Sequence, residues 1–385
     1  MSMRALRAAV VGTGAIGRQH ANAIALSEGL ELVALVNRGR EPALALAETA
    51  KTWGSARPGV YSSLDDAFAA EDIDVVGIAT PSATHADLAE RALARGAHVL
   101  VEKPLDVSLA RARGLAAVVE RAAARGLVAS VVSQHRFDPS SLAVRAAVTD
   151  GRLGRITSGL ASVAWWRSQR YYDANPWRGT WRMDGGGAVM NQSIHTIDLL
   201  VWFLGTPVEV SATTATLAHP GLEVEDTAVA TVVFESGALA TVHATTAAYP
   251  GLTARLQIMG TRGSAVIDQD ELVYFHAAGE GDDAPDMGLD GRGDQTGTLD
   301  GLVRAAGPHL DPTLTPEGHV RQYADLREAI ASGRPPTTPV RDAVTVLATV
   351  GAVYASSVAR RPVRVEDVIA GRYDGVLPPS GRADG

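Results

Sequence analysis

The chain contains no cysteine, and only two of its 385 residues are lysines. The lack of cysteine excludes disulfides, thiolate nucleophiles and cysteine-ligated metal sites. Arginine supplies the other 33 basic residues, so each lysine stands out in this composition. One of them, Lys103, lies in the run Val-Leu-Val-Glu-Lys-Pro at 99–104. Because lysine, unlike arginine, can lose its proton when partly buried, we expect a chemical role for Lys103 rather than retention by chance.

Long apolar runs and an excess of basic charge are also missing. No stretch approaches ~20 uncharged apolar residues, the length that crosses a bilayer, and no apolar signal region precedes the first strand pattern. The formal net charge is −8, with no basic stripe for nucleic acid. We therefore expect a soluble, cytoplasmic protein that binds neither membrane nor nucleic acid, and the length predicts two domains.

The first 135 residues alternate between short apolar runs and alanine-rich helical patterns. Strands are expected at 8–11, 31–36, 74–79, 98–101 and 128–133, and helices at 15–27, 42–51, 84–95 and 109–125. Buried parallel strands joined by crossover helices give this pattern. Residues 1–135 are therefore predicted to form a doubly wound, parallel α/β domain of the Rossmann type.

After about Gly154 the pattern changes to segments rich in Thr, Val and Ala that alternate like an antiparallel sheet with one solvated face. Such strands are expected at 156–164, 208–217, 227–234, 238–246, 253–259 and 264–268, with helices at 188–204, 319–331 and 340–359. Residues 136–385 are predicted to be a second α/β domain. The acidic, glycine-rich stretch 277–301 is predicted to be an exposed loop.

A glycine-rich turn follows the first predicted strand and opens the first helix. Gly12 permits a tight turn, Gly14 lets a pyrophosphate approach the backbone, and Gly17 allows close helix–strand packing. The helix N-terminus offers unpaired N–H groups and a favourable dipole to phosphates. The turn therefore predicts a dinucleotide site made by Gly12, Thr13, Gly14, Ala15, Ile16 and Gly17.

The end of the second strand bears on the choice of dinucleotide. An acidic residue about twenty positions after the glycines would bind the ribose 2′-hydroxyl of NAD. This chain has Asn37, Arg38 and Arg40 there, with no carboxylate until Glu41. The arginines suit a 2′-phosphate, although solvated charges at a helix entry would look the same. We expect NADP to be preferred, with NAD as the alternative.

Three further motifs follow this signature in order. They are Ala79-Thr80-Pro81 with His85, then Glu102-Lys103-Pro104, then Gly185-Gly-Gly-Ala-Val-Met-Asn191-Gln-Ser-Ile-His195. Together they resemble the glucose–fructose oxidoreductase / inositol dehydrogenase / rhizopine-catabolism family (Gfo/Idh/MocA). The resemblance implies an N-terminal Rossmann domain and a C-terminal α/β domain with an open, mostly antiparallel sheet that binds substrate. It also implies a homo-oligomer, a dimer or a tetramer, formed through that sheet.

The resemblance implies roles for individual residues. Lys103 would reach the substrate hydroxyl or carbonyl as general acid/base, next to a cis peptide bond with Pro104. Glu102 would lie near the nicotinamide ribose, and His135 and Arg136 would face the cleft beside the substrate. Further cofactor contacts would come from Thr80, Pro81, His85, Gln134, Trp177 and Arg178.

Asn191 and His195 are four residues apart and share one face of a predicted helix, with Asp198 three residues further on. Many members of the family carry aspartate where this chain has Asn191. Asparagine can hold a substrate hydroxyl but cannot stabilise an imidazolium by charge, so Lys103 is the better candidate for proton transfer and His195 for positioning the oxygen. The alternatives are a core histidine for His195 and a packing contact for Asp198. A zinc or manganese site at these three residues would lack a second histidine, and we expect no metal.

Four of the six tryptophans fall between positions 165 and 182, among tyrosines and arginines. Aromatic faces stack on the C–H faces of polyols while hydrogen-bonding arms hold the hydroxyls, although a hydrophobic seam or a subunit interface would have a similar composition. Substrate contacts are expected from Lys103, Arg136, Trp165, Arg167, Tyr172, Asn191 and His195. An anionic substrate would suit Arg167, Arg170 and Arg178, although arginine is this chain's usual cation.

The predicted activity is hydride transfer between nicotinamide and a carbinol or ketone carbon of a sugar, sugar derivative or cyclitol. Lys103 would accept or donate the hydroxyl proton. One alternative is the reduction of a non-sugar ketone, imine, dihydrodiol or tetrapyrrole. The other is a sensor that binds NADP and a sugar without turnover.

Overall fold

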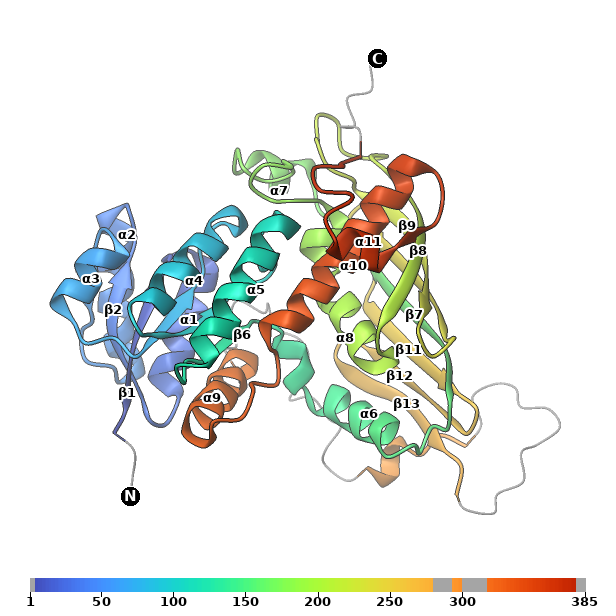
Figure 1. Ribbon diagram of the computed structural model, residues 1–385, viewed down its shortest axis with the longest axis horizontal. Helices are drawn as coiled ribbons and strands as arrows, with labels where there is room; N and C mark the ends of the chain where they lie inside the picture. The colour runs from blue at the N-terminus through green and yellow to red at the C-terminus, as the bar shows by residue number, and fades with distance from the viewer. Residues whose placement is uncertain (1–3, 280–292, 300–316, 379–385) are drawn as a thin grey trace. The chain divides into compact units, whose positions relative to one another are not determined.

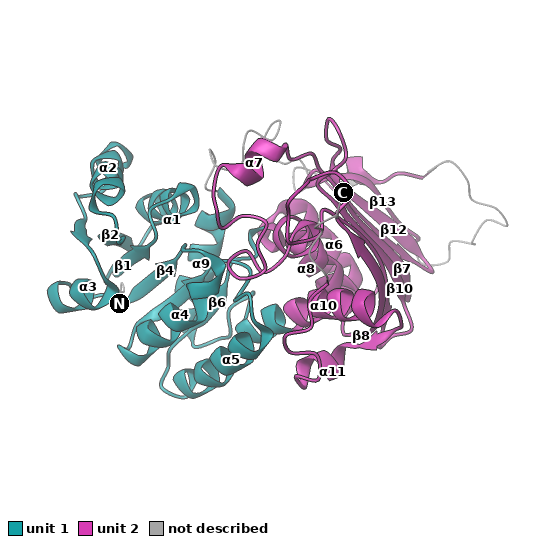
Figure 2. Ribbon diagram, turned by 90° about the horizontal axis from the view of Figure 1, so that it is seen from above, with its two compact units in different colours: residues 1–134, 309–344 teal, residues 135–308, 345–385 magenta. Residues whose placement is uncertain are grey.

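The computed structural model describes residues 4–279, 293–299 and 317–378, which form two compact units (Figures 1 and 2). Unit 1 takes in residues up to Gln134 and the later segment that ends at Val344. Unit 2 begins at His135 and resumes at Thr345. Most of the predicted loop at 277–301 lies outside the described residues, and the expected domain boundary after residue 135 stays a prediction.

Unit 1 is built on a six-stranded sheet in the order β3-β2-β1-β4-β5-β6, in which every neighbouring pair is parallel. The strand order reverses between β1 and β4, and ligands of such sheets bind at the carboxyl ends of the strands beside this reversal. The strands are β1 (Leu6–Val11), β2 (Leu30–Val36), β3 (Gly59–Tyr61), β4 (Val75–Ile78), β5 (His98–Val101) and β6 (Ala129–Val131). The predicted doubly wound parallel sheet is confirmed.

Helices cover both faces of this sheet, with α1 and α2 on one side and α4 and α5 on the other (Figure 2). The helices are α1 (Ala15–Leu26), α2 (Arg40–Ala50), α3 (Leu64–Ala70), α4 (His85–Ala94), α5 (Leu109–Ala123) and α9 (Glu317–Ser332). Ser63 caps α3 by accepting a hydrogen bond from the Asp66 N–H. Helix α9 comes late in the chain, yet its Tyr323 and Leu326 pack in one buried cluster with Ile24 of α1.

Unit 2 is built on an eight-stranded sheet in the order β13-β12-β11-β7-β10-β9-β8-β14. Strands β7 and β10 are parallel, and the other neighbouring pairs are antiparallel, which confirms the predicted mostly antiparallel sheet. The strands are β7 (Ile156–Ala164), β8 (Pro207–Ala215), β9 (Thr227–Phe234), β10 (Leu239–Thr245), β11 (Ala254–Gly260), β12 (Gly263–Asp268), β13 (Glu271–Ala277) and β14 (Val363–Arg364).

Helices α6, α8 and α10 lie on one face of this sheet (Figure 1). Gly159 of β7 lets α8 pack closely, because a Cβ at that position would lie 2.8 Å from Leu200 Cδ1. The helices are α6 (Pro139–Thr149), α7 (Gln169–Asp173), α8 (Ile194–Leu204), α10 (Val340–Ala359) and α11 (Val365–Ile369). Among the described residues, α10 is long and apolar enough to cross a bilayer, with a mean hydropathy of 1.4, but 61% of it is buried, as in a core helix.

The helix predicted at 188–204 is not continuous. Residues Ala188–Gln192 form a π-helical turn, and α8 begins after Ser193. Such turns are rare and are often found at functional sites. The interruption changes the spacing of side chains between Asn191 and His195, which straight helical geometry would place on one face.

Candidate active site

The glycine turn between β1 and α1 has the geometry of a phosphate-binding loop. Gly12 has φ +96°, and a Cβ there would lie 2.3 Å from the Ala79 carbonyl oxygen, while a Cβ on Gly17 would lie 1.9 Å from the Gly12 oxygen. Gly14 has no atom within 4 Å of its Cβ position. Gly12 and Gly17 are therefore required by packing, and Gly14 leaves open space at a helix N-terminus that suits an anion.

Two polar atoms among the predicted cofactor residues of unit 1 are buried without a hydrogen-bond partner in the described chain: Thr13 Oγ1 and Gln134 Oε1. Buried polar atoms are almost always hydrogen-bonded in native proteins, so such exceptions point to a bound ligand. Asn37 follows β2, and its Nδ2 donates to the Gly39 carbonyl oxygen at 2.8 Å, while Arg38 is exposed. These residues fit a dinucleotide.

His85 connects two of the predicted cofactor loops. Its Nδ1 lies 2.8 Å from the Pro104 carbonyl oxygen, and its Nε2 lies 2.8 Å from the Thr80 carbonyl oxygen. The Thr80 and Thr84 hydroxyls are hydrogen-bonded at 2.8 Å. The imidazole, 1% exposed, thus ties the loop that holds Thr80 and Pro81 to the loop that carries Lys103.

Lys103 follows β5, and its peptide bond with Pro104 is cis. The preceding side chain, Glu102, points into unit 1 and accepts a hydrogen bond from the Lys103 backbone N–H at 3.0 Å. The Nε2 atoms of His20 and His319 lie 3.1 and 3.3 Å from Glu102 Oε1. The Glu102 carboxylate thereby anchors the backbone from which Lys103 extends.

Burial alone would raise the pKa of Glu102, but its hydrogen bonds with His20 and His319 hold that pKa well below its usual range. Burial lowers the pKa of His20. An ionised Glu102 therefore faces a neutral His20, which donates from Nε2 and accepts at Nδ1 from the Tyr323 hydroxyl at 2.8 Å. His20, Glu102 and His319 have the spacing of a metal site, and hydrogen bonds already account for this cluster.

In unit 2, Asn191 lies in the π-helical turn and is oriented by a buried carboxylate. Its Nδ2 donates to Asp184 Oδ1, and the Gly179 N–H donates to Asp184 Oδ2 at 2.9 Å. Asp184 is 4% exposed. Sequence reasoning missed Asp184, although it directly precedes the three glycines, because nothing in a linear pattern relates it to a side chain seven positions later.

A second buried acid, Glu225, holds the glycine segment that leads into this turn. The N–H groups of Gly187 and Val189 donate to its carboxylate at 3.0 and 2.8 Å, and the Tyr354 hydroxyl donates at 3.1 Å. Burial raises the pKa of Glu225 to about 7. A Cβ on Gly186 would lie 2.1 Å from the Tyr354 hydroxyl oxygen, so glycine is required there. The sequence pattern did not predict that Glu225 accepts these backbone hydrogen bonds.

His195, at the start of α8, packs edge-to-face against His135, with ring centroids 5.1 Å apart. The Nδ1 of His135 lies 2.9 Å from Asp138 Oδ2 and 3.1 Å from Asp270 Oδ1. Burial opposes the charged form, but the two carboxylates outweigh it and raise the pKa of His135 well above its usual value. A cationic imidazole thus lies beside the candidate catalytic histidine.

Arg136 and Asp198 form a buried ion pair within unit 2. The Arg136 Nε and Nη2 donate to the two Asp198 carboxylate oxygens at 2.8 and 2.6 Å, and Arg136 is 2% exposed. Its guanidinium also lies 5.3 Å from the Trp202 ring centroid. Both Asp198 oxygens therefore have a strong partner, and a substrate contact through Arg136 stays a prediction.

The aromatic segment of unit 2, residues 165–182, contains both buried and half-buried side chains. Tyr172, 7% exposed, shares a hydrogen bond of 2.8 Å with the Thr246 hydroxyl, and burial raises its pKa to about 12. Its neighbour Tyr171 is half-buried, and two guanidinium groups lie over its ring: that of Arg167 at 5.4 Å and that of Arg178 at 4.2 Å from the ring centroid. A substrate contact through Tyr172 stays a prediction.

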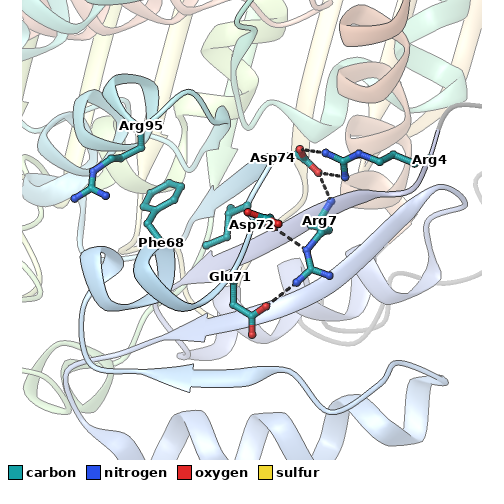
Figure 3. A pocket seen from close by; sticks show the side chains of 8 residues that line it. Arg4, Arg7, Phe68, Glu71, Asp72, Asp74 and Arg95 are labelled. Carbon is teal, nitrogen blue, oxygen red and sulfur yellow. Dashed lines mark hydrogen bonds and ion pairs between the residues drawn. The ribbon is translucent and has the colours of Figure 1, made fainter.

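A pocket lined by charged residues lies at the amino ends of β1 and β4 in the unit 1 sheet (Figure 3). Arg4 donates to both oxygens of Asp74 at 2.7 Å, and Arg7 Nη2 donates to Glu71 at 2.6 Å. These charges compensate one another at the amino ends of the strands, away from the edge at which such sheets bind ligands. We therefore place no site there.

Two family profiles match the chain. The profile described as an oxidoreductase family with an NAD-binding Rossmann fold covers residues 6–131. The profile described as the GFO/IDH/MocA C-terminal domain covers residues 141–266. The two matches follow one another in the same order as the two sheets.

Named relatives extend these matches. Inositol 2-dehydrogenase of Rhizobium meliloti (strain 1021) is 31% identical over 291 residues, which are 73% of this chain and 82% of that protein. 4-carboxy-2-hydroxymuconate-6-semialdehyde dehydrogenase of a Sphingobium species is 29% identical over 237 residues, 62% of this chain and 71% of that protein. The crystal structure of the WlbA dehydrogenase from Bordetella pertussis, in complex with NADH and UDP-GlcNAcA, aligns with a TM-score of 0.78 at 29% identity, over 94% of this chain and 99% of that one.

Proposed function

Because the chain belongs to the Gfo/Idh/MocA family of oxidoreductases, we propose that it transfers hydride between NAD(P) and a carbinol or ketone carbon of a sugar, sugar derivative or cyclitol. The observation that carries this proposal is the open space at Gly14, between a strand end and a helix N-terminus at the reversal of the unit 1 sheet. The unpartnered Thr13 hydroxyl in the same turn supports a bound dinucleotide.

Lys103 is the proposed general acid/base. The bound nicotinamide supplies or accepts the hydride. In the oxidation direction, Lys103 Nζ accepts the proton of the substrate hydroxyl, and in the reverse direction a protonated Lys103 stabilises the carbonyl oxygen and then protonates it. The ionised Glu102 fixes the Lys103 backbone through its hydrogen bond with the N–H.

The proposed substrate contacts in unit 2 are His195 and Asn191. His195 positions the reacting oxygen or relays its proton, and Asn191 holds a neighbouring hydroxyl. Asp184 fixes which end of the Asn191 amide is the donor. The family resemblance implies an aspartate at position 191. Here the carboxylate belongs to Asp184 instead and accepts a hydrogen bond from the Asn191 amide, so position 191 itself carries no charge.

We further propose that NADP is preferred over NAD. Asn37 and the exposed Arg38 follow β2, and the exposed Arg40 begins α2. The first acidic residue after β2 is Glu41, which lies within α2. Guanidinium groups pair well with a 2′-phosphate. NAD remains the alternative, since the WlbA structure contains NADH.

A homo-oligomer, a dimer or a tetramer, is proposed for the assembly. The face of the unit 2 sheet that carries the exposed side chains of Val229 and Leu239 supports this proposal. The cytoplasmic location stays a prediction. Light scattering on the purified protein measures the assembly directly, and a monomer at micromolar concentration would contradict the proposal.

The alternative substrate is a non-sugar ketone, imine or dihydrodiol. The Sphingobium relative is named a semialdehyde dehydrogenase, which supports a non-sugar substrate as the alternative. A sensor that binds NADP and a sugar without turnover would not need a catalytic lysine, and Lys103 is present in the Glu-Lys-Pro motif.

Two linked measurements test the proposal. Titration of the full-length protein with NADPH and NADH, followed by fluorescence, should give tighter binding of NADPH. Addition of a sugar and cyclitol panel with NADP+ or NAD+ at alkaline pH should then give growth of reduced-nicotinamide absorbance on at least one sugar. Turnover of ketones or imines with none of the sugars would establish the alternative substrate class, and no binding of either nucleotide would overturn the proposal.

A further inference from the structure

Arg167 is held rigidly beside the candidate catalytic turn of unit 2. Its backbone N–H donates to the Thr246 carbonyl oxygen at 3.0 Å, and its carbonyl oxygen lies 2.7 Å from His219 Nε2. Its side chain donates from Nη2 to Gln192 Oε1 at 2.9 Å. Because Gln192 directly follows Asn191, the guanidinium is fixed to the same turn that carries the proposed hydroxyl-binding amide.

Arg178 lies over the same Tyr171 ring as Arg167. Its guanidinium lies 4.2 Å from the Tyr171 ring centroid and 5.5 Å from that of Trp177, and its Nη1 donates to the Tyr171 carbonyl oxygen at 2.9 Å. The Arg167 guanidinium lies 5.1 Å from the Trp165 ring centroid. Stacking uses the flat face of a guanidinium and leaves the N–H groups at its edge available for a second partner.

Neither arginine forms an ion pair with any carboxylate in the described parts of the chain, although both are half-buried. Arg167 donates to the Trp166 carbonyl oxygen and to Gln192, which uses two of its five N–H groups, and its buried Nε has no partner among the described residues. The buried Arg136 of the same unit is different, since Asp198 binds it through two hydrogen bonds. Because neither guanidinium has a counterion among the described residues, both are available to form charge-assisted hydrogen bonds with an anionic group of a ligand.

We propose that Arg167 and Arg178, whose guanidinium groups both lie over the Tyr171 ring, form a subsite for an anionic group of the substrate, and that the substrate is therefore an acidic sugar. This inference rests on the proposed sugar oxidoreductase function and narrows its substrate class. The hydrogen bond between Arg167 and Gln192 places the subsite beside Asn191, so one sugar can offer a hydroxyl to Asn191 and its anionic group to the guanidinium edges. A carboxylate and a phosphate share this chemistry.

The test compares sugars that differ only in the anionic group: glucuronate and galacturonate against glucose and galactose, with glucose 6-phosphate as the phosphate arm. The full-length protein with bound NADPH is titrated with each sugar, and tryptophan fluorescence reports binding because Trp165 and Trp177 lie under the two guanidinium groups. Turnover with NADP+ is measured on the same panel. The variants are Arg167→Gln and Arg178→Gln, with Arg182→Gln as the control, since Arg182 is exposed in the same segment.

We expect an acidic sugar to bind more tightly than its neutral counterpart, and each of the two variants to lose about 10- to 100-fold of that affinity, the loss that follows from removing a hydrogen bond to a charged group. The control should keep it. A preference for the uronates over the phosphate identifies the anion as a carboxylate, and the reverse identifies a phosphate. Equal affinity for neutral and acidic sugars, or variants that bind uronate like the unmodified protein, would overturn the inference. If neutral sugars are turned over and the variants lose no affinity, the subsite is wrong and the proposed oxidoreductase function is supported. If acidic sugars bind but no sugar is turned over, the subsite is supported and the proposed function is wrong.

Discussion

Glu225 should make the stability of the protein depend on pH between about 4.5 and 7. The folded protein keeps a proton on this buried acid up to a pKa of about 7, whereas its usual pKa of 4.5 applies in the unfolded chain. The stability that this group contributes is fully present below pH 4.5 and is lost as the pH rises toward 7. One pKa unit corresponds to ~1.4 kcal/mol, so the loss is roughly 3 kcal/mol in the free energy of unfolding.

Glu225→Gln is the matched perturbation, because a neutral amide imitates the protonated acid and keeps an oxygen for the Val189 N–H. The melting temperature of the unmodified protein minus that of the variant should fall by roughly 6–12 °C between pH 5 and pH 8. This range follows from ~2–4 °C per kcal/mol for units of this size. Calorimetry at a series of pH values measures it. Glu235→Gln, at an exposed position after β9, is the control and should track the unmodified protein. A difference in melting temperature between Glu225→Gln and the unmodified protein that stays constant with pH would contradict a raised pKa at Glu225.

Two further predictions concern the glycine turn and the His135 cluster. Gly14→Ala should change the melting temperature little but weaken NADPH binding, because the new methyl group occupies open space, whereas Gly17→Ala should destabilise the fold, because its Cβ would lie 1.9 Å from the Gly12 oxygen. Calorimetry and fluorescence titration separate the two effects, and equal destabilisation by both would contradict the assignment. Asp270→Asn should lower the pKa of His135 while keeping the backbone, because asparagine tolerates the φ of +65° found there. NMR titration of the His135 ring protons measures this, and an unchanged pKa would mean that Asp138 alone holds the charge.

The periodicity of the sequence was sufficient for both sheets, because buried parallel strands and half-solvated antiparallel strands leave different patterns of apolar residues. It was not sufficient for β3 or β14, which are three and two residues long and too short to show a period. The packing of α9 on α1 was also beyond a local pattern. More than 290 residues separate Ile24 from Tyr323, and only the folded chain brings them together.

The candidate site also contains residues that the sequence pattern predicts and residues that only the fold brings together. Glycine and lysine are informative in sequence because their chemistry restricts where they can be used. The close packing at Gly12 and Gly17 was predicted in this way, and the role of Lys103 was inferred in the same way and stays a prediction. Asp184 and Glu225 were missed because their roles come from burial and from backbone N–H donors, which no spacing of residue types records. The break after Gln192 was missed for a related reason: residues 188–204 suit a continuous helix, and the π-helical turn is set by the fold around them.

Lys103 is the proposed proton-transfer residue, and the two lysines of the chain provide the test of this role and its control. The rate of hydride transfer is measured with saturating cofactor for the unmodified protein, for Lys103→Met and for Lys51→Met, in which the altered residue is exposed and paired with Glu48. We predict that Lys103→Met loses about 10²- to 10⁴-fold in rate, the contribution typical of a general acid/base, while binding NADPH normally. Lys51→Met should keep the full rate. Near-normal turnover by a folded, NADPH-binding Lys103→Met variant would show that Lys103 is not the general acid/base.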